Sequence, residues 1–161
     1  MIYKSGPDKV YVFENVLSSL ECKKYYEMIE NIGYQEQPLR WEHRIKDVSK
    51  DKIVNTIKNF LNKKLNIKLK LSNAEIQNWH VNTESPLHVH NHKEKGRKYT
   101  VHNSLLYLND DYKGGEFITK HGIIIKPKRG MLTFFNGQKV YHGVRRVFKN
   151  DRKTIIFWWS N

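Results

Sequence analysis

The chain has 161 residues, 39% of them hydrophobic and 12% aromatic, so it can bury a core and is not a disordered segment. No apolar run approaches the roughly 18 residues that a membrane span needs, and residues 1–9 lack the apolar segment of a signal peptide. We therefore expect a soluble, cytoplasmic protein without membrane contact. Cys22 is the only cysteine, which excludes an internal disulfide.

The formal net charge of +13 at pH 7 is the most unusual feature of the composition. A basic surplus of this size is typical of proteins that bind nucleic acids. Many lysines stand singly between polar residues, however, as in Lys50-Asp51-Lys52, which favours a surplus of solvated surface lysines. Charge alone therefore predicts no function, and a nucleic acid is the less favoured partner.

The N-terminal part of the chain alternates helical and extended patterns. Ser18 and Glu21 have the spacing of a capping box, and apolar residues follow at helical spacing as far as a stop at Gly33. Ser49 is the predicted N-cap of a second amphipathic helix, whose apolar stripe runs from Ile53 to Leu65. Two short strands are predicted around these helices, at Val10–Phe13 and Trp41–Ile45.

The C-terminal part is rich in short strands separated by turn signals such as Asn136-Gly137. Eight strands are predicted: Glu75–Val81, Leu87–His90, Thr100–Leu108, Gly115–Thr119, Ile123–Lys126, Met131–Phe135, Tyr141–Phe148 and Thr154–Trp159. This pattern favours an α+β, mainly β fold with a double-sheet jelly roll or barrel, and helices behind one sheet. We expect a single domain over residues 1–161, with a helical support region at 1–70 and the jelly-roll core at 71–161.

A cluster of histidines provides the clearest chemical signal. His88 and His90 lie two residues apart, so on an extended strand their side chains share a face and could hold one metal ion. His142 lies near the start of a late strand and is the candidate third ligand. Arg152 enters an apolar strand, where a buried guanidinium needs an anionic partner such as a small carboxylate. A solvated surface pair of histidines is the alternative interpretation.

Seven sequence elements then follow one another in a familiar order. They are Trp79, His88-Val89-His90, Tyr107-Leu108-Asn109, Gly114-Gly115-Glu116, Pro127-Lys128-Arg129-Gly130 with Phe134-Phe135, His142-Gly143-Val144, and Arg152 before Trp158. Over roughly residues 77–159 the chain resembles the 2-oxoglutarate- and Fe(II)-dependent dioxygenases of the prolyl 4-hydroxylase type. The resemblance implies a double-stranded β-helix fold, with Fe(II), 2-oxoglutarate and O2 as cofactor and co-substrates.

The resemblance also implies a role for each matching residue. His88 and His142 would be iron ligands, and Arg152 would pair with the far carboxylate of 2-oxoglutarate. Thr154 and the Tyr107 hydroxyl would help to bind that carboxylate, Asn103 would line the co-substrate pocket, and Trp79 and Trp158 would form walls of the site. Simple core packing is the alternative interpretation for Tyr107 and Trp158. The implied reaction is hydroxylation of an unactivated C–H bond, in a prolyl residue of a peptide or protein or in free proline.

One position departs from the family pattern, because His90 stands where the family has an aspartate ligand. We favour a working three-histidine iron site made of His88, His90 and His142. The alternatives are a degenerate oxygenase that serves as a metal-binding module, a carboxylate supplied by Glu94 or Asp110-Asp111, or His92 acting instead of His90. A halogenase is excluded, because those enzymes have a small residue at this position.

Two other classes of protein compete with this interpretation. A cupin-like metal-binding module also uses His-x-His, but Gly130 precedes His142 by twelve residues, as in the dioxygenases. A nucleic-acid-directed oxygenase would use the positive charge, but no base-flipping element is recognisable. The basic loop Asn91–Tyr99 would lie at the mouth of the site, either as a solvated loop or as a contact for an acidic substrate.

Overall fold

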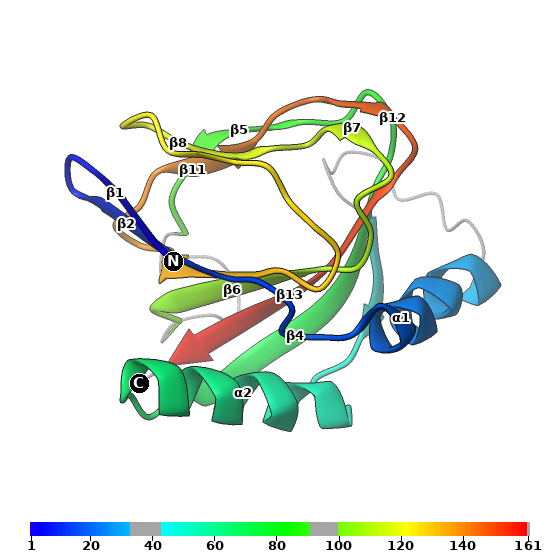
Figure 1. The fold of residues 1–161 in the computed structure, drawn as a ribbon, viewed down its shortest axis with the longest axis horizontal. Coiled ribbons are helices and arrows are strands. Elements are labelled where there is room, and N and C mark those ends of the chain that lie inside the picture. The colour runs from blue at the N-terminus through cyan, green and yellow to red at the C-terminus, as the bar shows by residue number, and fades with distance from the viewer. Residues whose placement is uncertain (33–42, 91–99, 161) are drawn as a thin grey trace.

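A computed structural model describes residues 1–32, 43–90 and 100–160, and shows two antiparallel sheets facing each other (Figure 1). The larger sheet has seven strands in the order β1 (Ile2–Ser5), β2 (Asp8–Phe13), β10 (Leu132–Asn136), β6 (His102–Tyr107), β13 (Arg152–Ser160), β4 (Lys70–Trp79) and β3 (His43–Asp47). The smaller sheet has four, in the order β5 (Ser85–His88), β11 (His142–Val144), β8 (Phe117–Thr119) and β9 (Ile124–Ile125). A separate pair joins β12 (Val147–Lys149) to β7 (Lys113–Gly114).

The two helices, α1 (Ser19–Ile32) and α2 (Lys52–Leu65), cover the face of the larger sheet that is turned away from the smaller one (Figure 1). The predicted class, mainly β with helices behind one sheet, is confirmed. Strands β1, β2 and β3 come from the first 70 residues and pair into the larger sheet, so this region also builds the sheet. Among the described residues, no helix is long and apolar enough to span a membrane.

Strand β13 lies near the middle of the larger sheet, between β4 and β6, and its side chains alternate between two cores. Ile155, Phe157 and Trp159 pack with residues of both helices on one face. Ile156 and Trp158 face the smaller sheet and pack with a second cluster that includes Phe117 and Phe135. Arg152 and Thr154 have the same parity as this second set. The space between the two sheets is therefore where the polar residues of β13 can meet those of β5 and β11.

The N-termini of the two helices can be compared with the predicted caps. The predicted capping box is confirmed, because Ser18 N donates to Glu21 Oε2 at 2.9 Å and Glu21 N donates to Ser18 Oγ at 3.3 Å. The N-cap predicted at Ser49 is wrong, because Asp51 caps α2 by accepting from the Ile53 amide. The Ser49 hydroxyl instead accepts from the backbone N–H of Ala74 at 2.9 Å, so a tertiary contact takes it away from the helix.

The strand predictions differ from the structure in several places. The strand predicted at Tyr141–Phe148 is divided into β11 and β12, because the chain leaves the smaller sheet there and pairs with β7. The short strands β1 and β7 were not predicted. Strand β5 ends at His88, so His90 lies beyond it. The helix stop at Gly33, the strand start at Trp41 and the loop Asn91–Tyr99 lie outside the described residues.

Candidate functional site

The smaller sheet brings the three predicted histidines together. His88 ends β5 and His142 begins β11, and the antiparallel register pairs these two residues directly. Their ring centroids are 4.5 Å apart, and the His90 ring lies 5.3 Å from that of His88 and 4.9 Å from that of His142. His90 is held beyond the strand end because its amide donates to the Gly137 carbonyl at 2.8 Å. One ring nitrogen from each histidine lies within 4.8 Å of the other two.

Hydrogen bonds to the three rings fix which nitrogen is available to a metal ion. In each ring Nδ1 faces a carbonyl oxygen: Pro86 O at 2.9 Å from His88, Val140 O at 2.9 Å from His142, and Asn103 Oδ1 at 2.8 Å from His90. A carbonyl oxygen only accepts, so Nδ1 must carry the hydrogen in each neutral ring. The lone pair is then on Nε2, and the site offers three Nε2 donors from three directions.

His142 is the most deeply placed of the three, at 5% exposure. Burial holds its pKa well below the usual value, and the neighbouring His90 and His88 lower it further. Its ring also packs against Phe117 and Phe135, with centroids 5.7 and 4.5 Å away. A neutral imidazole fixed among aromatic rings is a suitable ligand for a divalent transition metal.

The donor set fits Fe(II) or a similar ion with three neutral imidazoles and no carboxylate among the described residues. Among those residues, His88, His90 and His142 form the cluster of potential metal-ligating side chains (His, Cys, Asp or Glu) whose ligand atoms lie close enough to hold one ion. Asp110 and Asp111 do not replace the missing aspartate: Asp110 pairs with Arg129 at 3.7 Å, and Asp111 accepts from Asn109 at 2.8 Å. His92 and Glu94 lie outside the described residues.

Arg152 occupies the second part of the site and is fully buried. It begins β13 opposite Trp79 of β4, and its Cζ lies 5.1 Å from the ring centroids of both Trp79 and Tyr107. Within the described part of the chain, no acceptor is hydrogen-bonded to its Nε, Nη1 or Nη2. A buried guanidinium without an acceptor is too costly to be a packing residue, so this position calls for an anion.

Further buried donors in the inter-sheet space make no hydrogen bond of normal geometry within the described ranges, although the Tyr107 hydroxyl lies near Thr133 and Arg152, and the Tyr112 hydroxyl near Arg152. They are the hydroxyls of Tyr107, Tyr112, Thr133 and Thr154, the indole N–H of Trp79 and the amide nitrogen of Asn103. Burial raises the pKa of Tyr107 and of Tyr112, and the charge of Arg152 offsets part of both rises. Protonated hydroxyls around a guanidinium suit a carboxylate ligand, so this set fits one end of 2-oxoglutarate.

Because Gly115 has no side chain, Arg152 and Tyr112 can pack directly against its backbone. Its φ is +67°, and a Cβ there would lie 2.9 Å from Arg152 Cδ and 3.0 Å from Tyr112 Cε2. Glycine is therefore required both by the backbone conformation and by the space. Of the Gly-Gly pair in the sequence, Gly115 is the residue that leaves room for the Arg152 and Tyr112 side chains.

Asn103 and Trp158 are register partners on β6 and β13. Asn103 is fully buried, and its side chain meets His90, while Trp158 belongs to the inter-sheet core at 2% exposure. Asn103 thus lies beside the histidine cluster, and Tyr107, four residues later on the same face of β6, lies beside Arg152. Strand β6 connects the two parts of the site, and binding of 2-oxoglutarate by Asn103 and Trp158 remains a prediction.

Tyr112 and Thr133 were missed in the sequence. Thr133 had a usable signal, because it has the parity of Met131 and Phe135, which both face the inter-sheet core. A polar residue between two inward apolar residues indicates a lining position. Tyr112 follows the turn after β6, where no periodicity says which way a side chain points.

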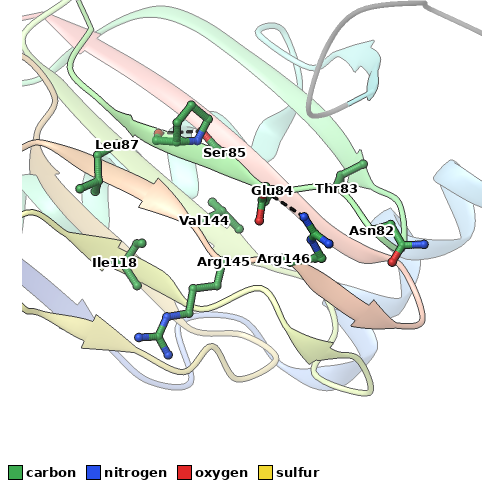
Figure 2. A pocket seen from close by; sticks show the side chains of 10 residues that line it. Asn82, Thr83, Glu84, Ser85, Leu87, Ile118, Val144, Arg145 and Arg146 are labelled. Atoms are coloured by element: carbon green, nitrogen blue, oxygen red, sulfur yellow. Dashed lines mark hydrogen bonds and ion pairs between the residues drawn. The ribbon is translucent and has the colours of Figure 1, made fainter.

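A separate groove of about 660 Å³ lies along β5 and β11 (Figure 2). Leu87 and Ile118 supply apolar surface, and Arg146 donates to Glu84 at 3.2 Å beside the exposed Arg145. Adjacent residues on a strand point to opposite faces, so Leu87 and His88 lie on opposite sides of β5. None of the three histidines is among the described residues that line this groove.

Comparison with known proteins agrees with this geometry. The family model of the 2OG-Fe(II) oxygenase superfamily matches residues 74–160. Human prolyl 3-hydroxylase 2 is 39% identical over 66 residues, which are 37% of this chain but only 9% of that protein. The chain therefore corresponds to about a tenth of this curated relative.

Solved structures that share the fold include a viral prolyl hydroxylase and HygX. The viral collagen prolyl hydroxylase of Paramecium bursaria Chlorella virus-1, in complex with 2OG, superposes with a TM-score of 0.72 at 18% identity over 94% of both chains. HygX of Streptomyces hygroscopicus, with nickel, 2-oxoglutarate and hygromycin B bound, has a TM-score of 0.71 at 14% identity, covering 94% of this chain and 82% of that one. The predicted double-stranded β-helix is thereby confirmed, and the chain belongs to the 2OG-Fe(II) oxygenase superfamily.

Proposed function

We propose that the chain is a 2-oxoglutarate- and Fe(II)-dependent dioxygenase that hydroxylates a prolyl residue in a peptide or protein, or free proline, with a three-histidine metal site. The observation that carries this proposal is the buried Arg152, which has no acceptor in the described part of the chain. It shares the inter-sheet space with the convergent His88, His90 and His142. A metal site alone would not need this guanidinium.

One end of the site would bind the metal ion and the other end would bind the far carboxylate of 2-oxoglutarate. His88, His90 and His142 would hold Fe(II) through Nε2, and three protein ligands leave positions open for other ligands. Arg152, Thr154 and Tyr107 would hold the far carboxylate of 2-oxoglutarate, with Tyr112 and Thr133 adding hydroxyl donors. When bound, Fe(II) would activate O2, which is the oxidant: one oxygen atom would go into the C–H bond to give C–OH, and the other into 2-oxoglutarate, which would be oxidised to succinate and carbon dioxide.

The site's walls would keep water away from the reacting centre. Trp79 and Trp158 are 6% and 2% exposed, and Phe117 and Phe135 pack on the His142 ring. In such a dry site the Arg152 charge acts strongly on an anion, because little solvent screens it. Arg152 would therefore orient the co-substrate as well as bind it.

The choice of a prolyl substrate follows the relatives. The viral neighbour is named a collagen prolyl hydroxylase, and the human relative a prolyl 3-hydroxylase. HygX was solved with hygromycin B, so the same fold also accommodates a substance that is not a peptide. Proline-containing peptides are thus the first substrates to test, and free proline the second.

A second candidate is a metal-binding module without turnover. The observation that favours it is the ligand set itself, because three neutral imidazoles leave a site one negative charge poorer than two histidines and an aspartate. The charge of 2-oxoglutarate would compensate for this in a working enzyme. A module would bind metal without converting the co-substrate.

Succinate production tests these alternatives. We expect the wild-type protein to form succinate from 2-oxoglutarate only with Fe(II), and faster with a proline-containing peptide. His90→Asp restores the family ligand set, and Arg152→Ala removes the anchor. Metal binding with no succinate under any condition would support the module, and full activity of Arg152→Ala would contradict the assigned anchor.

A further inference from the structure

We infer that Asn103 is the positioning residue that makes His90 a metal ligand in place of the family aspartate. This inference rests on the proposed three-histidine site. It assigns Asn103 a task at the metal end, in addition to the predicted contact with 2-oxoglutarate. Asn103 would act through His90 and would not touch the metal itself.

A hydrogen bond joins the side chains of Asn103 and His90. Asn103 Oδ1 lies 2.8 Å from His90 Nδ1, and Asn103 is fully buried on the central strand β6. An amide oxygen can only accept, so the bond holds the hydrogen on Nδ1 and leaves the lone pair on Nε2. Without it, the other tautomer would place a hydrogen on the nitrogen that must bind the metal.

The three histidines differ in how their rings are held. His88 and His142 have backbone carbonyl acceptors, and their residues belong to strands of the smaller sheet. His90 lies beyond the end of β5, and the acceptor for its Nδ1 comes from the side chain of Asn103 on the opposite sheet. The orientation of this ring thus depends on a side chain that can be replaced.

Gly137 packs directly against the hydrogen-bonded pair of Asn103 and His90. A Cβ on Gly137 would lie 2.0 Å from Asn103 Oδ1 and 3.0 Å from His90 Nδ1. The Gly137 carbonyl also accepts from the His90 amide at 2.8 Å. Gly137 therefore fixes the His90 backbone while leaving room for the side-chain hydrogen bond.

Asn103 gives the His90 ring a neutral hydrogen-bond acceptor, and the loss of this acceptor should lower the affinity for the metal ion. Metal-bound histidines commonly donate their second N–H to a carbonyl or a carboxylate, and losing that partner typically costs 10–100-fold in metal affinity. Asn103→Asp would keep the acceptor at the same place and add a negative charge behind the ring. Asn103→Leu would keep the approximate volume and remove the acceptor.

The test measures binding of Ni(II) alone by calorimetry, together with the visible spectrum of the Co(II)-loaded protein, which reports the number of ligands. Asn103→Leu should weaken Ni(II) binding about 10–100-fold and change the Co(II) spectrum, whereas Asn103→Asp should bind at least as tightly as wild type. Ser104→Ala is the matched control: Ser104 is the next residue of β6, equally buried, and accepts from Trp159 Nε1 at 2.8 Å on the helix side. Its Ni(II) affinity should not change.

A cycle with His90→Ala separates positioning from general damage. In that background Asn103→Leu should cause no further loss of Ni(II) affinity, because the ring it orients is absent. Thermal unfolding of the metal-free variants checks the fold, and Gly137→Ala, which displaces the Asn103 oxygen, gives the same test if Asn103→Leu does not fold.

The possible results separate the inference from the proposal beneath it. Wild-type affinity in Asn103→Leu, or equal losses in Asn103→Leu and Asn103→Asp, would overturn the inference while the three-histidine site stands. Ni(II) binding that is indifferent to His88→Ala and His142→Ala would overturn the site itself. Loss in Asn103→Leu, retention in Asn103→Asp and no change in Ser104→Ala would support both.

Discussion

The two faces of β13 are equally buried but differ in whether their polar side-chain atoms are hydrogen-bonded. On the helix side, Ile155, Phe157 and Trp159 are fully buried in an apolar core, and the one indole N–H there is satisfied by Ser104. On the side facing the smaller sheet, Arg152 and Thr154 are equally buried, but their polar atoms have no partner in the described ranges. Burial is the same on both faces, and polar satisfaction differs.

This difference separates stability from function within one strand. A satisfied apolar face contributes to folding through the area that it buries. A face with buried unpaired donors costs folding free energy, and such a cost is characteristic of positions that await a ligand. Substitutions on the two faces of β13 should therefore affect different measurements.

The largest effect is expected on the helix side. Phe157 is fully buried and stacks on Trp159 with centroids 5.5 Å apart. Phe157→Ala should lower the free energy of unfolding by about 3–5 kcal/mol, because it removes a large apolar side chain and leaves a cavity. Denaturant unfolding measures this loss, and a change below about 1 kcal/mol would contradict the role of this face.

Arg152→Met should have the opposite signature. We expect 2-oxoglutarate binding to weaken by about 100-fold, near 2.7 kcal/mol, because the buried guanidinium that would bind its carboxylate is lost. The free energy of unfolding should stay equal or rise, since replacing a buried uncompensated charge by an apolar side chain removes a desolvation cost. Calorimetric titration with 2-oxoglutarate and denaturant unfolding give the two numbers.

Arg145→Met is the matched control for that substitution. Arg145 is exposed in the groove behind β5, outside the inter-sheet space. Its 2-oxoglutarate affinity should equal that of wild type. Equal losses in the two variants would mean that overall charge, and not the buried guanidinium, attracts the co-substrate.

A smaller effect should follow from removing one hydroxyl. Tyr112→Phe deletes a buried O–H that makes no hydrogen bond of normal geometry with the described residues. It should weaken 2-oxoglutarate about tenfold, the value of one hydrogen bond to a charged group, without lowering the free energy of unfolding. Unchanged affinity with lower stability would place this hydroxyl among the structural contacts.

The smallest effect belongs to the start of α2, and it depends on pH. Partial burial acts to raise the pKa of Asp51, but hydrogen bonds from the Ile53 amide and the Tyr25 hydroxyl outweigh it, so the pKa lies below its usual value. Ionised Asp51 therefore stabilises the fold above the unfolded-state pKa of about 4, and this contribution is lost as the pH falls through the lowered folded-state pKa.

Asp51→Ala tests this N-cap directly. It should cost about 1 kcal/mol near neutral pH, and the difference from wild type should shrink on acidification. Denaturant unfolding at several pH values measures the trend. A difference that does not vary with pH would mean that the carboxylate charge plays no part in the cap.

The sequence predicts much of this molecule because its strongest signals are local or ordered along the chain. The apolar run Thr154–Trp159 identified the core of β13, and the spacing of Ser18 and Glu21 identified the start of α1. The motif order placed His88, His142 and Arg152 in one family frame, and the structure brings the histidines within contact of each other.

The remaining features depend on contacts between distant segments. Ser49 and Asp51 are both good N-cap residues, and only the contact of Ser49 with Ala74 decides between them. His90 was expected on a strand, but it lies beyond β5 and is oriented by Asn103 and Gly137. No local sequence pattern predicts the contact of His90 with Asn103 and Gly137, because it forms only when the two sheets face each other.

Oxygen transfer tests the central claim most directly. The purified protein with Fe(II), 2-oxoglutarate and a proline-containing peptide under isotopically labelled O2 should place one labelled oxygen atom in the peptide and one in succinate. His142→Ala should abolish the product, and Arg152→Met should lower it strongly at 2-oxoglutarate concentrations that saturate the wild type. Labelled succinate without labelled peptide would leave an oxygenase with another substrate, and unlabelled peptide together with no succinate would contradict an oxygenase centre built on these residues.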